Sequence, residues 1–155
     1  MDAVFGSLIA VLGTLFGSIS TYVFQRKATE RAAAEARLER LRQERLTAYG
    51  AFAGAVTDLK RGAVSQWYRR KEDNGGPAHL AAIAESDRLA AAVEAAVFRM
   101  HMVSDTEGLH DLADAAYASA RQTRRADDEA DLREREGRFE ARMKEFIAAT
   151  AASLR

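Results

Sequence analysis

The sequence begins with a long stretch that carries no charged side chain. From Ala3 to Phe24 there are 22 residues without Asp, Glu, Lys or Arg, and Asp2 is the only such residue before Arg26. A helix of this length rises about 33 Å, which matches the hydrocarbon core of a bilayer. Its eleven Val, Leu, Ile and Phe residues contribute about −5 kcal/mol to insertion, partly offset by Ser, Thr and Gly. The stretch therefore predicts a transmembrane anchor at residues 1–25.

The residues on either side of this stretch indicate a retained anchor and its direction. A cleaved signal peptide would need a positively charged start, whereas only Met1 and Asp2 precede the apolar run. Three cations, Arg26, Lys27 and Arg31, follow at once and favour the cytoplasmic side. We expect a single-pass protein of the cell membrane with its N-terminus outside and its C-terminus in the cytoplasm. The three cations are then placed to contact anionic headgroups of the lipid bilayer.

Small residues recur along one face of the predicted anchor. Their spacings of 4, 3, 4 and 3 residues keep them in one stripe, against which a second helix would pack. The stripe contains a GxxxG pair, a pattern that lets two helix backbones approach closely in lipid. We expect the protein to form a homo-oligomer through this stripe, which comprises Gly6, Ala10, Gly13, Gly17 and Ser20.

The composition of the whole chain predicts an all-α protein. Ala supplies 33 of the 155 residues, Arg outnumbers Lys by 19 to 4, and there is one Pro. Such a composition strongly favours helix. Between residues 26 and 45 the only larger apolar side chains are Leu38 and Leu41, so this segment has little to bury. It is predicted to be a juxtamembrane helical stalk, which can join a coiled coil if the anchor oligomerises.

Residues 46–155 are predicted to form a cytoplasmic helical bundle. An apolar stripe runs from Tyr49 to Trp67 and stops at the breaker of residues 74–77. Pro77 suits the first turn of a second helix, predicted over 77–103. A turn follows, in which Ser104 or Asp105 is expected to cap the third helix. The ranges 46–72, 77–103 and 128–154 hold 27 residues each, and these matching lengths predict an antiparallel arrangement around a core rich in Ala.

The boundary between the third and fourth helices is the least marked one. No Gly or Pro separates them, but the apolar stripe shifts by about one residue near Ala126, or about 100° of rotation. Asp127, Asp128 and Glu129 are the acids expected in a first helical turn, because they oppose the helix dipole. We therefore predict a four-helix bundle with its last helix at 128–154. One bent helix over 105–154, and so a three-helix bundle, is the alternative.

One short segment has the spacing of a metal site. Glu107 and His110 form the E-x-x-H pattern of di-iron bundles, and Asp111 and Asp114 lie on the same side of that helix. A di-iron site also needs a second such motif, and neither of the other two His residues follows an acid by three positions. We therefore predict no metal and no other cofactor, and metal binding by these four residues is the minority alternative.

No motif indicates catalysis or nucleic-acid binding. The chain has no Cys, no G-x-S-x-G, no glycine-rich phosphate loop and no H-E-x-x-H, so we do not expect an enzyme. Its 23 basic and 23 acidic residues cancel, which argues against nucleic acid as a partner. Aromatic and basic residues do cluster at the end of the first bundle helix. This cluster is the candidate surface for an unidentified protein partner: Trp67, Tyr68, Arg69 and Arg70.

Three features of the first 70 residues combine into a recognisable pattern. They are a glycine-rich anchor that ends at Tyr22–Arg26, an Arg-rich stalk, and the phrase Arg45-Leu46-Thr47-Ala48-Tyr49-Gly50-Ala51-Phe52. In these features the chain resembles uncharacterised single-pass helical membrane proteins of high-GC actinobacteria. No activity is known for that group, so the resemblance implies a topology and no chemistry.

These features together favour a membrane-anchored cytoplasmic scaffold or interaction protein without enzymatic activity. The main alternative is a holin-like or pore-type membrane protein, because a faint polar stripe of Ser7, Thr14, Ser18 and Thr21 also runs along the anchor. A metal-binding helical bundle is the third hypothesis.

Overall fold

The computed structural model describes the backbone of residues 2–104, 106 and 108–154, and the side chains of Tyr22 and of residues 24–104, 106 and 108–154. Helix is the only regular secondary structure in these parts of the chain, which confirms the all-α prediction. The chain divides into two compact units, Met1–Leu41 and Arg42–Arg155. The division falls close to residue 46, where the bundle was predicted to begin.

Helix α1 covers Asp2–Glu72 and passes through both units. In the first unit, every described side chain is exposed, including Leu38 at 68% and Leu41 at 49%. Arg26 and Glu30, which lie about one helical turn apart, form an exposed ion pair with 2.9 Å between Nε and Oε1. A segment of Ala and charged residues has no apolar face to bury, so this exposure follows from its composition.

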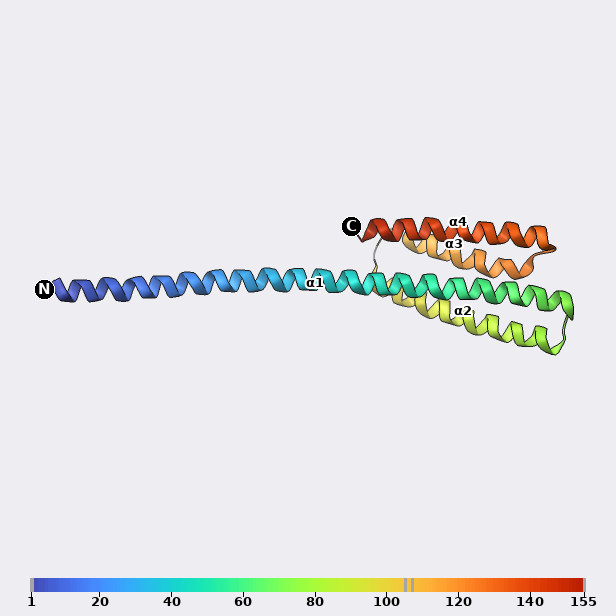
Figure 1. The fold of residues 1–155 in the computed structure, drawn as a ribbon, viewed down its shortest axis with the longest axis horizontal. Helices are drawn as coiled ribbons and strands as arrows, with labels where there is room; N and C mark the ends of the chain where they lie inside the picture. The colour runs from blue at the N-terminus through green and yellow to red at the C-terminus, as the bar shows by residue number, and fades with distance from the viewer. Residues whose placement is uncertain (1, 105, 107, 155) are drawn as a thin grey trace. The chain divides into compact units, whose positions relative to one another are not determined.

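The second unit contains the remaining helices. They are α2 (Pro77–Val103), α3 (Leu109–Gln122), the 3₁₀ helix η1 (Thr123–Arg125) and α4 (Glu129–Ser153). Figure 1 shows the end of α1 side by side with α2, α3 and α4, each helix running opposite to the one before it. The four-helix prediction is therefore confirmed. Residues 109–153 form two helices rather than one bent helix.

The turn between α1 and α2 follows from its sequence. Gly75 has φ 87°, a left-handed conformation that side chains disfavour, and Gly76 donates its N–H to Asp73 O at 3.1 Å. Pro77 occupies the first turn of α2, as predicted, because its missing N–H has no helical partner there. His79 closes the turn, since its Nδ1 accepts a hydrogen bond from Gly75 N at 3.0 Å.

The turn between α2 and α3 differs from the prediction. The residue that caps α3 is Gly108, with φ 75°, and Ser104 instead ends α2 by donating its N–H to Met100 O. Ser104 does not cap α3 because α3 begins only at Leu109, five residues later; the Oγ of Ser104 instead accepts hydrogen bonds from Tyr49 Oη at 2.8 Å and from Thr106 N at 3.3 Å. Arg45 Nε donates to Val103 O at 2.8 Å, so α1 satisfies the last carbonyl of α2. Asp105, the other predicted cap, lies outside the described residues.

The core is built on the predicted stripe of α1. Every member of that stripe is buried, and Phe52 and Val56 are fully inaccessible. The ring of Phe52 packs against Phe146 of α4 with 4.8 Å between centroids, and Tyr49 meets Phe146 edge-on at 6.4 Å. On α3 small residues dominate the buried positions, which are Leu109, Ala113, Ala116 and Ala120. Large side chains from α1 and α4 therefore fill the space that the small residues of α3 leave.

We predict that Phe52→Ala lowers the free energy of unfolding by about 3–5 kcal/mol, because it removes a fully buried ring and leaves a cavity. Leu80→Ala is the control, since Leu80 is 58% exposed, and should change stability by less than about 0.5 kcal/mol. Denaturant unfolding of the full chain, followed by circular dichroism, measures both. Equal stability of the two variants would contradict this core.

Candidate functional site

The predicted partner surface lies at the last two turns of α1, and its Trp is buried. Trp67 is 3% exposed and packs with Ala126 and Leu132. Its Nε1 donates a hydrogen bond to Ala126 O at 2.6 Å, and Lys71 Nζ lies 5.4 Å from the ring centroid. The indole thus finds both an apolar setting and an acceptor inside the bundle. Trp67 holds the link between α3 and α4 and is not available to a partner.

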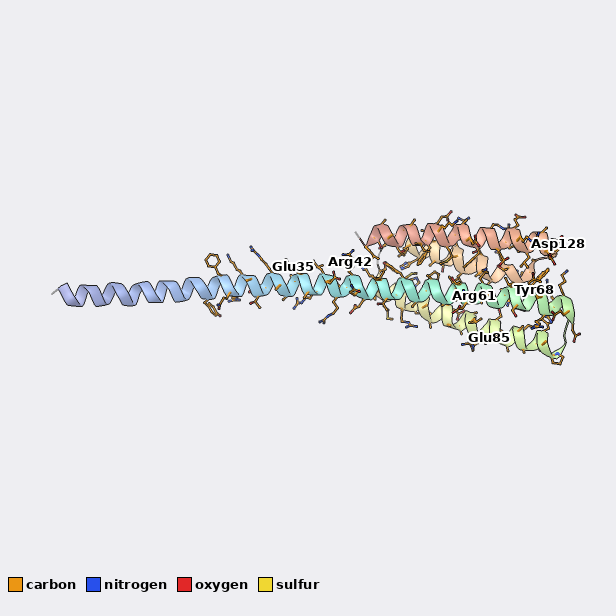
Figure 2. The ribbon with its side chains drawn as sticks, in the orientation of Figure 1. Glu35, Arg42, Arg61, Tyr68, Glu85 and Asp128 are labelled. Atoms are coloured by element: carbon orange, nitrogen blue, oxygen red, sulfur yellow. The ribbon has the colours of Figure 1, made fainter. Side chains whose placement is uncertain are left out.

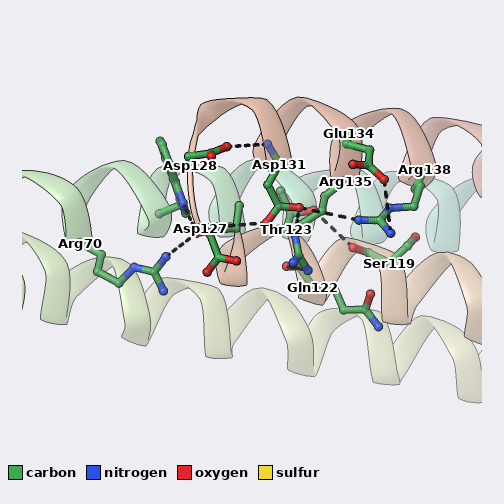
Figure 3. Close-up of polar contacts among 12 residues, drawn as sticks. Arg70, Ser119, Gln122, Thr123, Asp127, Asp128, Asp131, Glu134, Arg135 and Arg138 are labelled. Atoms are coloured by element: carbon green, nitrogen blue, oxygen red, sulfur yellow. Dashed lines mark hydrogen bonds and ion pairs between the residues drawn. The ribbon is translucent and has the colours of Figure 1, made fainter.

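The cations next to Trp67 serve the same link. Arg70 Nη2 donates to Ala126 O at 2.8 Å, and Lys71 Nζ donates to Asp127 O at 2.8 Å. Figure 3 shows Arg70 reaching toward the residues that precede α4. These cations bind backbone carbonyls that no helix uses, which would otherwise need water. This bonding is a contact between segments distant in sequence, so the pattern of aromatic and basic residues did not reveal it.

The other two residues of the predicted surface stay at the exterior. Tyr68 is 47% exposed and meets the edge of Trp67 with 4.9 Å between ring centroids. Arg69 is exposed and pairs with Glu72, with 2.8 Å between Nη1 and Oε2. Of the four predicted residues, Trp67 and Arg70 therefore contact the link between α3 and α4, and Tyr68 and Arg69 remain exposed. A partner surface at this end of α1 stays a prediction.

The start of α4 is held by two reciprocal hydrogen bonds. Asp128 Oδ1 accepts from Asp131 N at 2.8 Å, while Asp131 Oδ2 accepts from Asp127 N at 3.0 Å. Asp131 also pairs with Arg135, with 2.8 Å between Oδ1 and Nε (Figure 3). The backbone N–H of Asp127, and then Arg135, hold the pKa of the Asp131 carboxyl below its ordinary value. Of the predicted acids, Asp128 is the side-chain cap of α4, whereas Asp127 contributes its backbone N–H and Glu129 pairs with Arg133. Asp131, which was not predicted, completes the cap.

A groove of about 440 Å³ between α3 and α4 was not predicted. Three arginines line it, namely Arg135, Arg138 and Arg142, and the last pairs with Glu145 at 2.9 Å. The first two pair with Asp131. The groove therefore offers guanidinium groups that already hold carboxylates, which limits its attraction for an anion. The signal in the sequence is the spacing of three and four residues, which places all three Arg on one face of α4.

A smaller hollow of about 250 Å³ shares Ala118 and Gln122 with this groove. Its other lining residues are Arg121, Arg124 and Arg125, at the end of α3 and in η1. Arg121 lies over the ring of Tyr117 with 5.6 Å to the centroid. Cations at the end of a helix also interact favourably with its dipole, so this position by itself indicates no ligand.

The structure does not gather the residues of the metal alternative. The rings of His110 and His101 contact each other, with 4.0 Å between centroids, and both Asp111 and Asp114 are exposed. Among the described residues, no group of three or more His, Asp or Glu is placed to hold a metal ion. His110 Nε2 is buried and has no hydrogen-bond partner in the described part of the protein. Glu107 lies outside the described residues.

The predicted anchor falls mainly on residues whose side chains lie outside those described, and this includes the whole small-residue stripe. No helix in the described part of the chain is long and apolar enough to cross a membrane. The anchor and its self-association therefore stay predictions. The three cations predicted to meet lipid headgroups are exposed on α1: Arg26, Lys27 and Arg31.

Part of the chain matches a known protein family. Residues 46–154 match the family described as KilB plasmid transfer protein, which covers the region of the four-helix bundle. No curated protein and no solved structure matches the chain. The family match overlaps the first 70 residues only over 46–70, so the resemblance to actinobacterial membrane proteins stays a prediction.

We predict that Asp128→Ala lowers the free energy of unfolding by about 1 kcal/mol, because it removes the side-chain cap of α4. Asp127→Ala is the matched control. This variant keeps the backbone N–H of residue 127, from which the Asp131 carboxylate accepts a hydrogen bond. It should lower the free energy of unfolding by less than half as much as Asp128→Ala. Thermal unfolding of both variants measures the difference, and an equal loss in the two would show that the cap contributes nothing specific.

Proposed function

The chain belongs to the KilB plasmid transfer protein family, and from this membership we propose that it acts in plasmid transfer as a membrane-anchored scaffold without enzymatic activity. The observation that carries the proposal is the position of the match. It covers residues 46–154 and leaves outside it the apolar stretch and the Arg-rich segment. A family domain preceded by such a stretch is what a tethered protein requires.

The mechanism we propose is placement. Residues 1–25 insert in the cell membrane, with the N-terminus outside, and residues 26–45 extend as a stalk on the cytoplasmic side. The bundle then presents its surfaces to other proteins near the bilayer. The packed core of the bundle supports this role, since its fully buried side chains give a rigid body.

A pore-type protein is the second candidate, and one observation favours it. Ser7, Thr14, Ser18 and Thr21 would face one another if several anchors formed a ring, and water could then pass between them. A scaffold needs only the small-residue stripe, whereas a pore needs the polar one. Release of a dye from vesicles that contain the full chain separates the two, because a scaffold releases none.

We predict that Leu12→Arg combined with Phe16→Arg releases the protein from the membrane fraction and lowers plasmid transfer at least about tenfold. Each Arg at the centre of an inserted helix costs about 2.5–3.5 kcal/mol, so two offset the apolar contribution of the whole stretch. Ala28→Arg adds a charge just beyond the stretch and is the matched control. It should keep both membrane association and transfer.

Membrane association and plasmid transfer are measured separately, and each result tests a different part of the proposal. If the double variant stays in the membrane fraction and transfers normally, the anchor is wrong. If the protein leaves the membrane but transfer continues, the chain does not act from the bilayer. Loss of transfer in the Ala28→Arg control would show that any added charge in this region is harmful, and would remove the support from the comparison.

We further predict that Gly13→Leu or Gly17→Leu reduces cross-linked oligomers in membranes. A bulky side chain at either position prevents the close backbone approach, and each favourable interhelical contact in lipid is worth about 1–2 kcal/mol. Leu15→Ala removes apolar bulk off the stripe and should cross-link like the unsubstituted chain. Normal cross-linking of both Gly variants would show that the stripe is only composition.

A further inference from the structure

Helix α2 carries two faces of opposite character, and the second has no partner within the described chain. Its core face repeats every seven residues, at His79, Ser86, Val93 and Met100, all buried. The opposite face follows alternating spacings of three and four residues, and all its members are exposed. They are Ala81, Ala84, Arg88, Ala91, Ala95, Phe98 and Met102. We call this set the α2 outer stripe.

The outer stripe is apolar where the exterior of a bundle is normally polar. Phe98 is 69% exposed and Met102 is 77% exposed, next to each other on successive turns. Single exposed apolar residues are common, but a continuous row in heptad register is the pattern of a helix that packs against another helix. The stripe therefore points to a helical partner.

The one charged member of the stripe is compatible with such packing. Arg88 pairs with Glu85, with 2.6 Å between Nη2 and Oε1, so its guanidinium is held at the edge of the stripe. Glu85 is labelled on α2 in Figure 2. The aliphatic part of Arg88 can then lie on an apolar partner while its charge remains at the rim.

Both the charges and the side-chain sizes fit a second copy of α2 in the antiparallel direction. About a centre between Ala91 and Ala95, Glu85 and Arg99 lie on the same flank of the stripe, and Glu85 of each copy falls about 3 Å along the helix axis from the level of Arg99 of the other, close enough for an opposite-charge pair at both ends. On the other flank, Glu94 of each copy comes near Glu94 of the other, so only one flank favours the pairing by charge. The layers place Ala84 against Met102 and Arg88 against Phe98. Large residues thus face small ones or an aliphatic stem, which keeps the helix spacing even.

The parallel alternative fits less well. It would set Arg88 against Arg88, and two like charges would meet inside the contact. It would also stack Phe98 on Phe98 and Met102 on Met102 at one end, while Ala faces Ala at the other. The two helices would then be pushed apart at one end only.

We propose that α2 pairs with α2 of a second copy of this chain, antiparallel, through the outer stripe. The pairing is a two-fold symmetric contact, in which the same residues contribute from both copies. It is separate from the anchor stripe and does not depend on a role in plasmid transfer.

Cysteine cross-linking tests the pairing directly, because the chain has no Cys of its own. Full-length Ala84→Cys and Met102→Cys chains carrying different tags are co-expressed and oxidised. We expect a disulfide-linked pair that contains both tags, and little linked product from either variant alone. Ile147→Cys is the control: Ile147 is 53% exposed on α4, so with Met102→Cys it should give only background linking.

Each other outcome counts against the proposal. Strong linking of Met102→Cys to itself would show a parallel contact and overturn the antiparallel one. Linking of Met102→Cys to Ile147→Cys as strong as to Ala84→Cys would show collision rather than pairing. Absence of the mixed product would show that the outer stripe does not join two copies.

Substitutions that keep the fold give a second test. Phe98→Glu, added to the two cysteine chains, should lower the mixed disulfide product at least about tenfold, with unchanged circular dichroism because the side chain is exposed. Glu85→Arg and Arg99→Glu should each lower the mixed disulfide product several-fold, and the two together should restore it to within about twofold. Failure of the double variant to recover would exclude the charge pairing that selects a second copy.

Discussion

The packing of one apolar face of α1 against the other three helices is the interaction on which the bundle depends. Phe52 and Val56 are fully buried, and Phe52 meets Phe146 of α4 with 4.8 Å between ring centroids. Helix α3 cannot replace these contacts, because most of its buried positions are Ala. Since buried area sets the hydrophobic contribution, α1 and α4 supply most of the core. Polar contacts then hold both ends of the part of α1 that lies in the bundle, through Tyr49 to Ser104 and through Trp67 to Ala126.

The same helix changes character along its length. Its second part is the central element of the family domain, whereas its exposed middle carries Ala and charge and begins after an apolar stretch. One continuous helix can thus have an apolar stretch suited to lipid in one part and a single apolar face suited to a bundle core in another. This division supports the proposal that the chain holds a folded domain at a bilayer.

Much of the fold could be predicted because the signals are local. The breaker at residues 74–77 and the stripe from Tyr49 to Trp67 give the first helix end and its buried face, and the structure has both. The break before α4 was predictable from the acids at residues 127–129, and one of these, Asp128, is the cap of α4. The failures involve contacts between segments far apart in sequence. Ser104 was predicted to cap α3, but its Oγ accepts a hydrogen bond from Tyr49. The groove of Arg135, Arg138 and Arg142 needs α3 beside α4, which no single segment specifies.

The central claim is that residues 1–25 cross the membrane and leave the bundle in the cytoplasm, and labelling of intact cells tests it most directly. The chain has no Cys, so Asp2→Cys and Ala152→Cys each introduce one thiol. A membrane-impermeant maleimide should label the Asp2→Cys protein in intact cells, and the Ala152→Cys protein only after lysis. Labelling of Ala152→Cys but not Asp2→Cys before lysis would contradict the orientation. Protection of both thiols until lysis would contradict the crossing itself.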